Sequence, residues 1–328
     1  MHETALVPYA HLPRAHHDHH VLTSTVDVYG VAHWLLAESA PQPGGDLPPF
    51  DALVVSVDPD ETVELTELTS VRAHWPQLDR LPDGGFVVAA SRARRDEDAN
   101  QVQVFDALGR ETTSFFVGDA IEHLLVDESG HLWVAHFDEN PVGIRRWSAT
   151  GRLAWTSDGA RIPGLFDCYA LNVSGTTAWA LPVHGLPARR DTRPPRPAGD
   201  GAGNRVRGAH AVAVHGDRVA FYGGYGDEQD RLAHAELTEA SVEPTDVGLL
   251  TLPDGSAPGP DASSAGEAGS TSRPSRSPRG ACSTSAADTR HGEVWALRPR
   301  ASITPRSSPP SGRPEHGRCA ATTRWGRA

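Results

Sequence analysis

The chain has 328 residues, a formal net charge of −12 and 30 basic residues, all of which are arginine. A chain this acidic is not expected to bind nucleic acid, because binding to a phosphate backbone requires clustered positive charge. Its cysteines, Cys168, Cys282 and Cys319, are far apart and form no C-x-x-C pair. A disulfide framework is therefore not expected, and a reducing compartment fits.

The N-terminal residues are not expected to act as a targeting signal. Residues 1–14 lack the charged start and unbroken apolar core of a signal peptide, and nowhere do 18 apolar residues follow one another. The sequence therefore predicts a cytoplasmic protein with no membrane partner, in which residues 1–20 form a histidine-rich lead-in.

This lead-in ends in a polar cluster of four histidines and one aspartate. One hypothesis is that the cluster binds a divalent transition metal, since neutral imidazole suits zinc, copper, nickel and iron. Adjacent residues, however, point in different directions unless the chain turns, so a solvated segment is the competing interpretation. The residues are His16, His17, Asp18, His19 and His20.

Residues 21–252 consist of short apolar strands separated by turn signals, which is typical of an all-β domain. In the clearest stretch, Ile121 to Val126 is followed by a turn in which Gly130 is free to adopt a positive φ, and then by the strand His131 to Phe137. Both faces of this second strand carry large side chains, which predicts a strand packed between two neighbouring sheets. Leu132, Val134 and His136 lie on one face, and Trp133, Ala135 and Phe137 on the other.

The stretch has copies elsewhere in the chain. Residues 105–110 (FDALGR) match residues 147–152 (WSATGR) position for position, 42 residues apart. Phe86, Trp133 and Trp179 follow similar glycine turns at spacings of 47 and 46 residues. Spacings of about 40 to 50 residues suit a repeated four-stranded unit.

This pattern resembles the bacterial β-propellers with degenerate repeats, which are grouped with quinoprotein-like, NHL-like and Trp-Asp-repeat (WD40-like) folds. The resemblance covers about residues 21–252 and implies an all-β propeller of four-stranded blades, with five blades recognisable and six or seven if the ring closes. Gly-His and Trp-Asp dipeptides do not recur in register, which argues against the Trp-Asp subclass. So general a resemblance carries over no catalytic residue. The expected blades are 23–68, 71–117, 120–159, 166–183 and 209–246.

Two segments interrupt or follow the predicted blades. Residues 185–208 are dense in Arg, Pro and Gly, so an exposed loop is expected there. Residues 253–328 carry a net charge of +5, against −17 for the rest of the chain, and lose hydrophobic periodicity. They are predicted to be a disordered tail or the product of a reading frame that has shifted, although His291 to Leu297 also looks like one more inner strand.

Three histidines fall on predicted innermost strands at comparable distances before the following turn. His74, His123 and His210 could form a ring around the central channel and hold a divalent transition metal. The competing interpretation is that each is a half-buried side chain bonded to a neighbouring blade.

The sequence predicts an architecture more firmly than an activity. The first hypothesis is a scaffold propeller that binds a protein or small ligand. A metal-dependent enzyme built around the three inner histidines is the second, and whether the protein is an enzyme stays open. A third is a truncated or frameshifted product without stable function, because an incomplete ring leaves an apolar blade face open.

Overall fold

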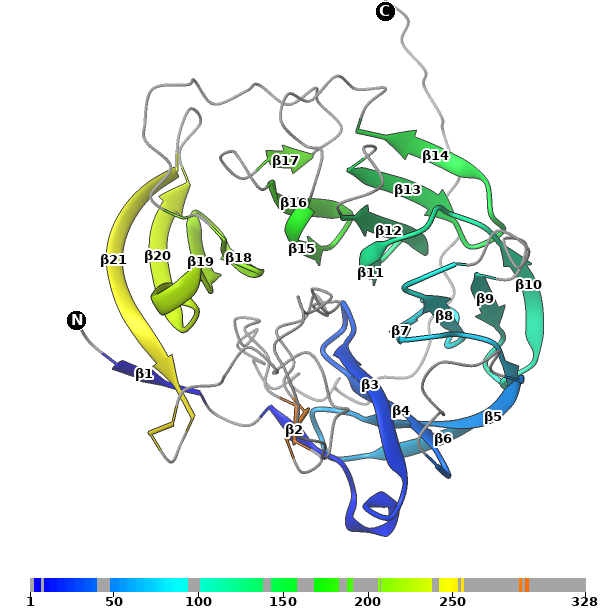
Figure 1. Ribbon diagram of the computed structural model, residues 1–328. Coiled ribbons are helices and arrows are strands. Elements are labelled where there is room, and N and C mark those ends of the chain that lie inside the picture. The colour runs from blue at the N-terminus through cyan, green and yellow to red at the C-terminus, as the bar shows by residue number, and fades with distance from the viewer. Residues whose placement is uncertain are drawn as a thin grey trace, which may run out of the picture.

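The computed structural model describes residues 3–6, 9–39, 48–93, 101–137, 143–157, 168–182, 188–190, 206, 208–237, 242–252, 255–256, 289–290 and 293–294. Over these ranges the protein consists of β-strands and two short 3-10 helices, η1 (Arg14–His16) and η3 (Gly226–Glu228). Six sheets stand side by side around a common axis (Figure 1), which confirms the predicted all-β propeller. Within the described ranges, no helix is long and apolar enough to span a membrane.

The first three blades follow the predicted boundaries, and each is a four-stranded antiparallel meander. In every one the strand that comes first in the chain lies nearest the axis (Figure 1). The first blade contains β3 (His20–Val26), β4 (Ala32–Ala37), β5 (Phe50–Val57) and β6 (Val63–Val71). The second contains β7 (Pro76–Arg80), β8 (Phe86–Ala90), β9 (Val102–Phe105) and β10 (Glu111–Phe115). The third contains β11 (Ile121–Val126), β12 (His131–His136), β13 (Ile144–Ser148) and β14 (Leu153–Thr156).

The fourth and fifth blades differ in detail from the prediction. The fourth contains β15 (Cys168–Ser174), β16 (Thr177–Pro182) and β17 (Ala188–Arg190). Strand β17 pairs with β16 inside the segment that was expected to be an exposed loop over residues 185–208, so that expectation is wrong for these three residues. The fifth contains β18 (Ala211–His215), β19 (Arg218–Tyr222), β20 (Arg231–Leu237) and β21 (Val242–Thr251). Residues 191–205 lie outside the described part of the chain.

Strands from the N-terminal and C-terminal parts of the sequence pair where the ring closes. Strand β1 (Glu3–Ala5) adds to the outer edge of the fifth blade by parallel pairing with β21. Strand β2 (Ala10–His11) pairs with β23 (Glu293–Val294), which pairs with β22 (Thr289–Arg290), and these form the sixth sheet. The lead-in is therefore part of the sheets, and the predicted strand at 291–297 is present at its β23 residues. The rest of 253–328, apart from residues 255–256, lies outside the described residues, so the tail and frameshift hypotheses stay predictions.

The cores lie between neighbouring blades, because each inner strand is apolar on both faces. On β12, Leu132 and Val134 pack into the cluster shared with the second blade. Trp133 and Ala135, on the opposite face, pack with β15 and β16 of the fourth blade. This confirms the predicted packing of β12 between two sheets.

The closing segment covers faces that would otherwise be exposed. Leu12 is buried against Trp34 and Leu36 of the first blade, with Tyr9 packed beside them. Leu6 packs against the buried face of the fifth blade. Leu6, Tyr9 and Leu12 thus cover part of the apolar faces of the first and fifth blades next to the sixth sheet.

Candidate functional site

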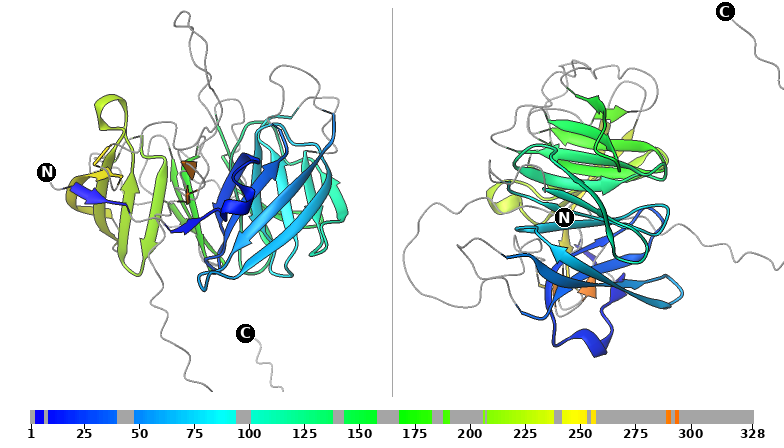
Figure 2. Two further views of the ribbon diagram at one scale, coloured as in Figure 1. Left: turned by 90° about the horizontal axis from the view of Figure 1, so that it is seen from below. Right: turned by 90° about the vertical axis from the view of Figure 1, so that its right-hand side faces the viewer.

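The two faces of the ring carry different connections. Because strands alternate in direction within each blade, the hairpin turns after β3, β7 and β11 lie on one face, which we call the turn face. The links from one blade to the next lie on the opposite face, which we call the connection face. Figure 2 shows the strands running between these faces. In propellers, ligands bind where the innermost strands converge, so the candidate side chains are those next to these strands.

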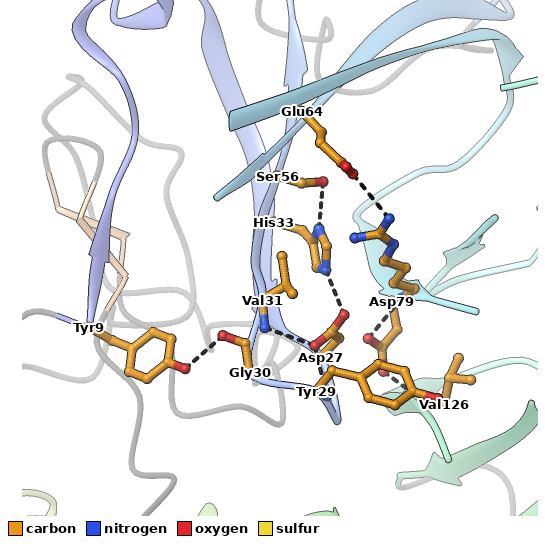
Figure 3. Close-up of polar contacts among 11 residues, drawn as sticks. Tyr9, Asp27, Tyr29, Gly30, Val31, His33, Ser56, Glu64, Asp79 and Val126 are labelled. Carbon is orange, nitrogen blue, oxygen red and sulfur yellow. Dashed lines mark hydrogen bonds and ion pairs between the residues drawn. The ribbon is translucent and has the colours of Figure 1, made fainter. Parts of the chain in front are cut away.

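A buried chain of hydrogen bonds joins three strands of the first blade (Figure 3). Asp27 Oδ1 accepts the N–H groups of Tyr29 and Val31, each at 2.9 Å. His33 lies with Nε2 3.1 Å from Asp27 Oδ2 and with Nδ1 2.8 Å from Ser56 Oγ. Burial alone raises the pKa of Asp27, but the bonds from His33 and from the two N–H groups outweigh it and hold this pKa below its usual value.

The third blade repeats this arrangement with different side chains. Asp127 and Trp133 occupy the positions of Asp27 and His33, and Arg146 lies across from Trp133 on β13. Asp127 Oδ2 accepts Trp133 Nε1–H at 3.0 Å and Arg146 Nη2–H at 2.6 Å. An indole N–H is only a donor, so this position donates to the carboxylate in both blades. His33 Nε2–H therefore donates to Asp27 Oδ2, and His33 Nδ1 forms a second hydrogen bond with Ser56 Oγ.

In the first blade, Ser56, His33 and Asp27 are bonded in the order of a Ser-His-Asp triad, but the serine is not accessible to a substrate. A nucleophile must reach its substrate, whereas Ser56 is 2% exposed. The second blade fills the three equivalent positions with apolar side chains, Leu81, Val87 and Val104. The network therefore holds the β3–β4 turn and does not form a reactive centre.

The second blade is tied to both of its neighbours near the turn face. The side chain of Asp79 is fully buried, and its Oδ2 accepts the N–H of Val126 in the third blade at 2.7 Å (Figure 3). The neighbouring Arg80 donates to Glu64 of the first blade at 3.1 Å. These contacts fix the relative positions of three blades.

On the connection face, a second cluster joins the second and third blades. Asp119 accepts the Ala93 N–H at 2.8 Å through Oδ1, and its backbone carbonyl accepts His136 Nδ1–H at 3.0 Å. The Arg92 guanidinium lies 4.5 Å from the centre of the Phe137 ring and 3.6 Å from Asp119 Oδ2. Burial lowers the pKa of His136 to about 4. His136 is therefore neutral at physiological pH and serves as a fixed donor.

The most exposed aromatic side chain among the described residues is Trp75, at 68%. Trp75 directly precedes β7, the strand of the second blade nearest the axis, and its φ is +46°. The Ser91 N–H holds the backbone there by hydrogen bonds of 3.2 Å to the carbonyls of His74 and Trp75. An indole is thus held in solvent on the connection face.

Across the ring, the fourth and fifth blades carry further aromatic residues on the same face. Tyr225, in the link between β19 and β20, is 50% exposed, and its ring centre lies 6.3 Å from that of Tyr169. A Cβ on Gly208 would lie 2.9 Å from the Tyr225 ring, so the absence of a side chain at Gly208 makes room for this tyrosine. Trp75 and Tyr225 were not among the side chains predicted from the sequence. The available signal was that both aromatic residues stand in connections and not in strand register.

The three inner histidines predicted to form a ring occupy unlike environments. His74 is half-buried with its ring centre 5.8 Å from that of Trp75. His123 is fully buried within β11, opposite Ala135. His210 contacts the edge of the Tyr222 ring at 4.9 Å, and burial lowers its pKa. Over the described residues, no three or more His, Cys, Asp or Glu side chains are placed to hold one metal ion. Metal binding by the predicted ring has no support from this geometry and stays a prediction that metal analysis of the purified protein tests.

The four histidines of the lead-in are separated by a turn. His16 ends η1, and its ring centre lies 5.7 Å from that of His19. His17 Nε2 lies 3.0 Å from the Leu12 carbonyl, and His20 begins β3. Burial and, next, the nearby His19 lower the pKa of His16.

Comparison with known proteins gives neighbours in structure and none in sequence. No family model and no curated protein matches the sequence. Among solved structures, a streptogramin B lyase aligns with a TM-score of 0.45 and 12% identity over 71% of this chain and 73% of its own. The extracellular domain of a putative hybrid two-component system, BT3049 from B. thetaiotaomicron, aligns with a TM-score of 0.44 and 9% identity. The alignment covers 69% of this chain but only 28% of the BT3049 chain. At these identities no residue role is transferred.

Proposed function

We propose that this protein is a scaffold propeller whose connection face binds a partner protein through Trp75. The observation that supports this is the exposure of Trp75, 68% of which is open to solvent beside an innermost strand. Tryptophan is among the residues most enriched at binding hot spots, because its large apolar surface is buried on association. A single exposed indole of this size supplies one anchor residue for the partner protein.

The backbone at Trp75 supports a role in binding over a role in packing. Its φ of +46° lies in the left-handed region, which costs a non-glycine residue about 1–3 kcal/mol. The two bonds from Ser91 hold this conformation. Ala120, which directly precedes β11 in the third blade, has a similar φ of +60° but is fully buried, so exposure at this position is particular to Trp75, and we infer that it serves binding.

The connection face as a whole carries further exposed side chains of the kinds found at interfaces. Phe116 and Tyr225, which lie in links on this face in the second and fifth blades, are 39% and 50% exposed. Arg92 and Asp119, also on this face, are partly exposed. Exposed aromatic residues with a charged rim are typical of protein interfaces.

The test uses peptides selected from a random phage-displayed library on the full-length protein. Selected peptides are then measured against the Trp75→Ala variant and against Leu108→Ala, because Leu108 is 69% exposed but lies on the turn face. Loss of one anchor predicts at least a tenfold weaker affinity for Trp75→Ala and an unchanged affinity for Leu108→Ala. Equal binding by all three proteins overturns the proposal. A thermal-shift screen of small molecules whose shifts disappear in Trp75→Ala would assign the face to a small ligand instead.

A further inference from the structure

The turn at the end of the lead-in places two of its four histidines together. His16 N–H bonds to the Pro13 carbonyl at 2.9 Å, and His19 N–H bonds to the His16 carbonyl at 3.2 Å. Both are bonds to the third residue before the donor, as in a 3-10 helix. Side chains three residues apart eclipse one another in that geometry. The turn therefore brings His16 and His19 onto one side.

The two imidazoles are close to the spacing that a shared metal ion requires. Their ring centres are 5.7 Å apart, and the rings are inclined by 61°. With Zn–N bonds of about 2.0–2.1 Å and tetrahedral angles, the ring centres would be about 5 Å apart. A small rotation about the side-chain bonds closes this difference, since both residues lie in a partly exposed turn.

The ring nitrogen atoms of His19 and His17 differ in their hydrogen-bond partners. His19 Nδ1 is buried and has no hydrogen-bond partner within the described part of the chain. A buried imidazole nitrogen without a partner calls for an explanation, and a metal ion supplies one. His17 Nε2, by contrast, lies at bonding distance from the Leu12 carbonyl. Asp18 adds a negative charge to the same turn, which Arg14 offsets.

We propose that His16 and His19 together bind one divalent transition-metal ion of the zinc, nickel or copper type. Two imidazoles would supply two ligands, with water completing the coordination. The turn joins β2, which belongs to the closing sheet, to β3, the first strand of the first blade (dark blue coil below β3 in Figure 1). A metal ion bound only by the folded turn stabilises the closed ring.

The experiment is calorimetric titration of the untagged, full-length, metal-free protein with ZnCl2 and, separately, NiCl2. We expect one saturable site per chain. His16→Gln and His19→Gln should each weaken binding at least tenfold, whereas His17→Gln and His20→Gln should change it less than threefold. Thermal melts of all the variants without metal check that each is folded.

A second readout is the thermal midpoint in the presence of ZnCl2. The midpoint should rise for the wild-type protein and for His17→Gln and His20→Gln. It should not rise for His16→Gln or His19→Gln. Absence of saturable binding overturns the proposal. Equal weakening in all four variants also overturns it, because that result describes an unspecific histidine cluster. Selective loss in the His16 and His19 variants, with both readouts in agreement, supports it.

Discussion

Aspartate at the start of a hairpin turn contributes differently to stability according to how deeply its side chain is buried. Asp27 and Asp106 each accept the N–H groups of the residues two and four positions later. Asp27 also binds a buried histidine and is 1% exposed, whereas the bonds of Asp106 are exposed to solvent. The same carboxylate cap therefore contributes more to stability in the first blade than in the second.

Asp27→Ala should lower the free energy of unfolding by about 3 kcal/mol, because it leaves buried donors without an acceptor. Asp106→Ala should lower it by about 1 kcal/mol, because water replaces the lost bonds. Urea denaturation of the two variants measures the difference. Equal losses would show that the burial of the Asp27 network contributes nothing.

His136 makes stability depend on pH over a defined window. Its pKa is lowered by burial from 6.5 to about 4 in the folded protein. As the pH falls below 6.5, His136 therefore becomes protonated in the unfolded chain, whereas in the folded chain it stays neutral until the pH approaches 4. The folded state loses stability as the pH falls from 6.5 toward 4, by up to about 3 kcal/mol.

His136→Gln should remove this part of the pH dependence, since glutamine keeps an N–H donor for the Asp119 carbonyl. His215→Gln, at an exposed position, is the control. Urea denaturation at several pH values from 4.5 to 7.5 measures the slopes, and an unchanged slope in His136→Gln would contradict the assignment. The contribution of Asp27 falls in a lower window, because a carboxyl with a lowered pKa loses its stabilising effect only below its ordinary value of 3.8.

At the scale of elements, tight turns position neighbouring blades as well as their own strands. Gly109, in the β9–β10 turn, has a φ of +74°, and a Cβ there would lie 1.8 Å from the backbone oxygen of Glu67 in β6. The turn of the second blade thus rests directly on the outer strand of the first. Gly216, in the β18–β19 turn, has a φ of +60° and nothing within 4 Å of its absent Cβ.

Gly109→Ala should cost about 3 kcal/mol or more, because it adds a backbone clash to the left-handed strain. Gly216→Ala should cost about 1 kcal/mol, from the strain alone. Thermal melts of the two variants compare these costs directly. Similar midpoints would mean that the contact between the β9–β10 turn and β6 relaxes without cost.

At the scale of the whole molecule, closure depends on the first residues of the chain. Leu6, Tyr9 and Leu12 cover apolar faces of the first and fifth blades. In the described ranges, the C-terminal contribution to closure is β22 and β23, of two residues each. Among the described residues, the N-terminal segment is therefore the larger closing element.

Deletion of residues 1–12 should lower the thermal midpoint by about 10 °C and promote self-association, because it exposes Trp34, Leu36 and Leu250. A chain that ends at Leu252 keeps this cover and should melt cooperatively at nearly the wild-type midpoint. Near-ultraviolet circular dichroism and size-exclusion chromatography give the two readouts. Should the chain ending at Leu252 be the less stable one, the C-terminal residues would be the main closing element.

The blades could be predicted from the sequence, because strand and turn signals are local. Period-two alternation on β12 and a positive-φ glycine at Gly130 need only a few neighbouring residues to be recognised. The first three blades were therefore predicted with nearly their observed boundaries. The repeat spacing, read along the chain, was sufficient to identify the class of fold.

The way in which distant segments meet is visible only in the folded chain. The pairing of β1 with β21 and of β2 with β23 joins residues more than 200 positions apart, and the partner of a strand is not a local property of its sequence. Whether the three inner histidines lie together could not be read from the sequence for the same reason. The positions of His74, His123 and His210 along their strands do not fix where each side chain points. The exposure of Trp75 and the short distance between the His16 and His19 rings likewise depend on the path of the folded chain and on which residues lie against each side chain.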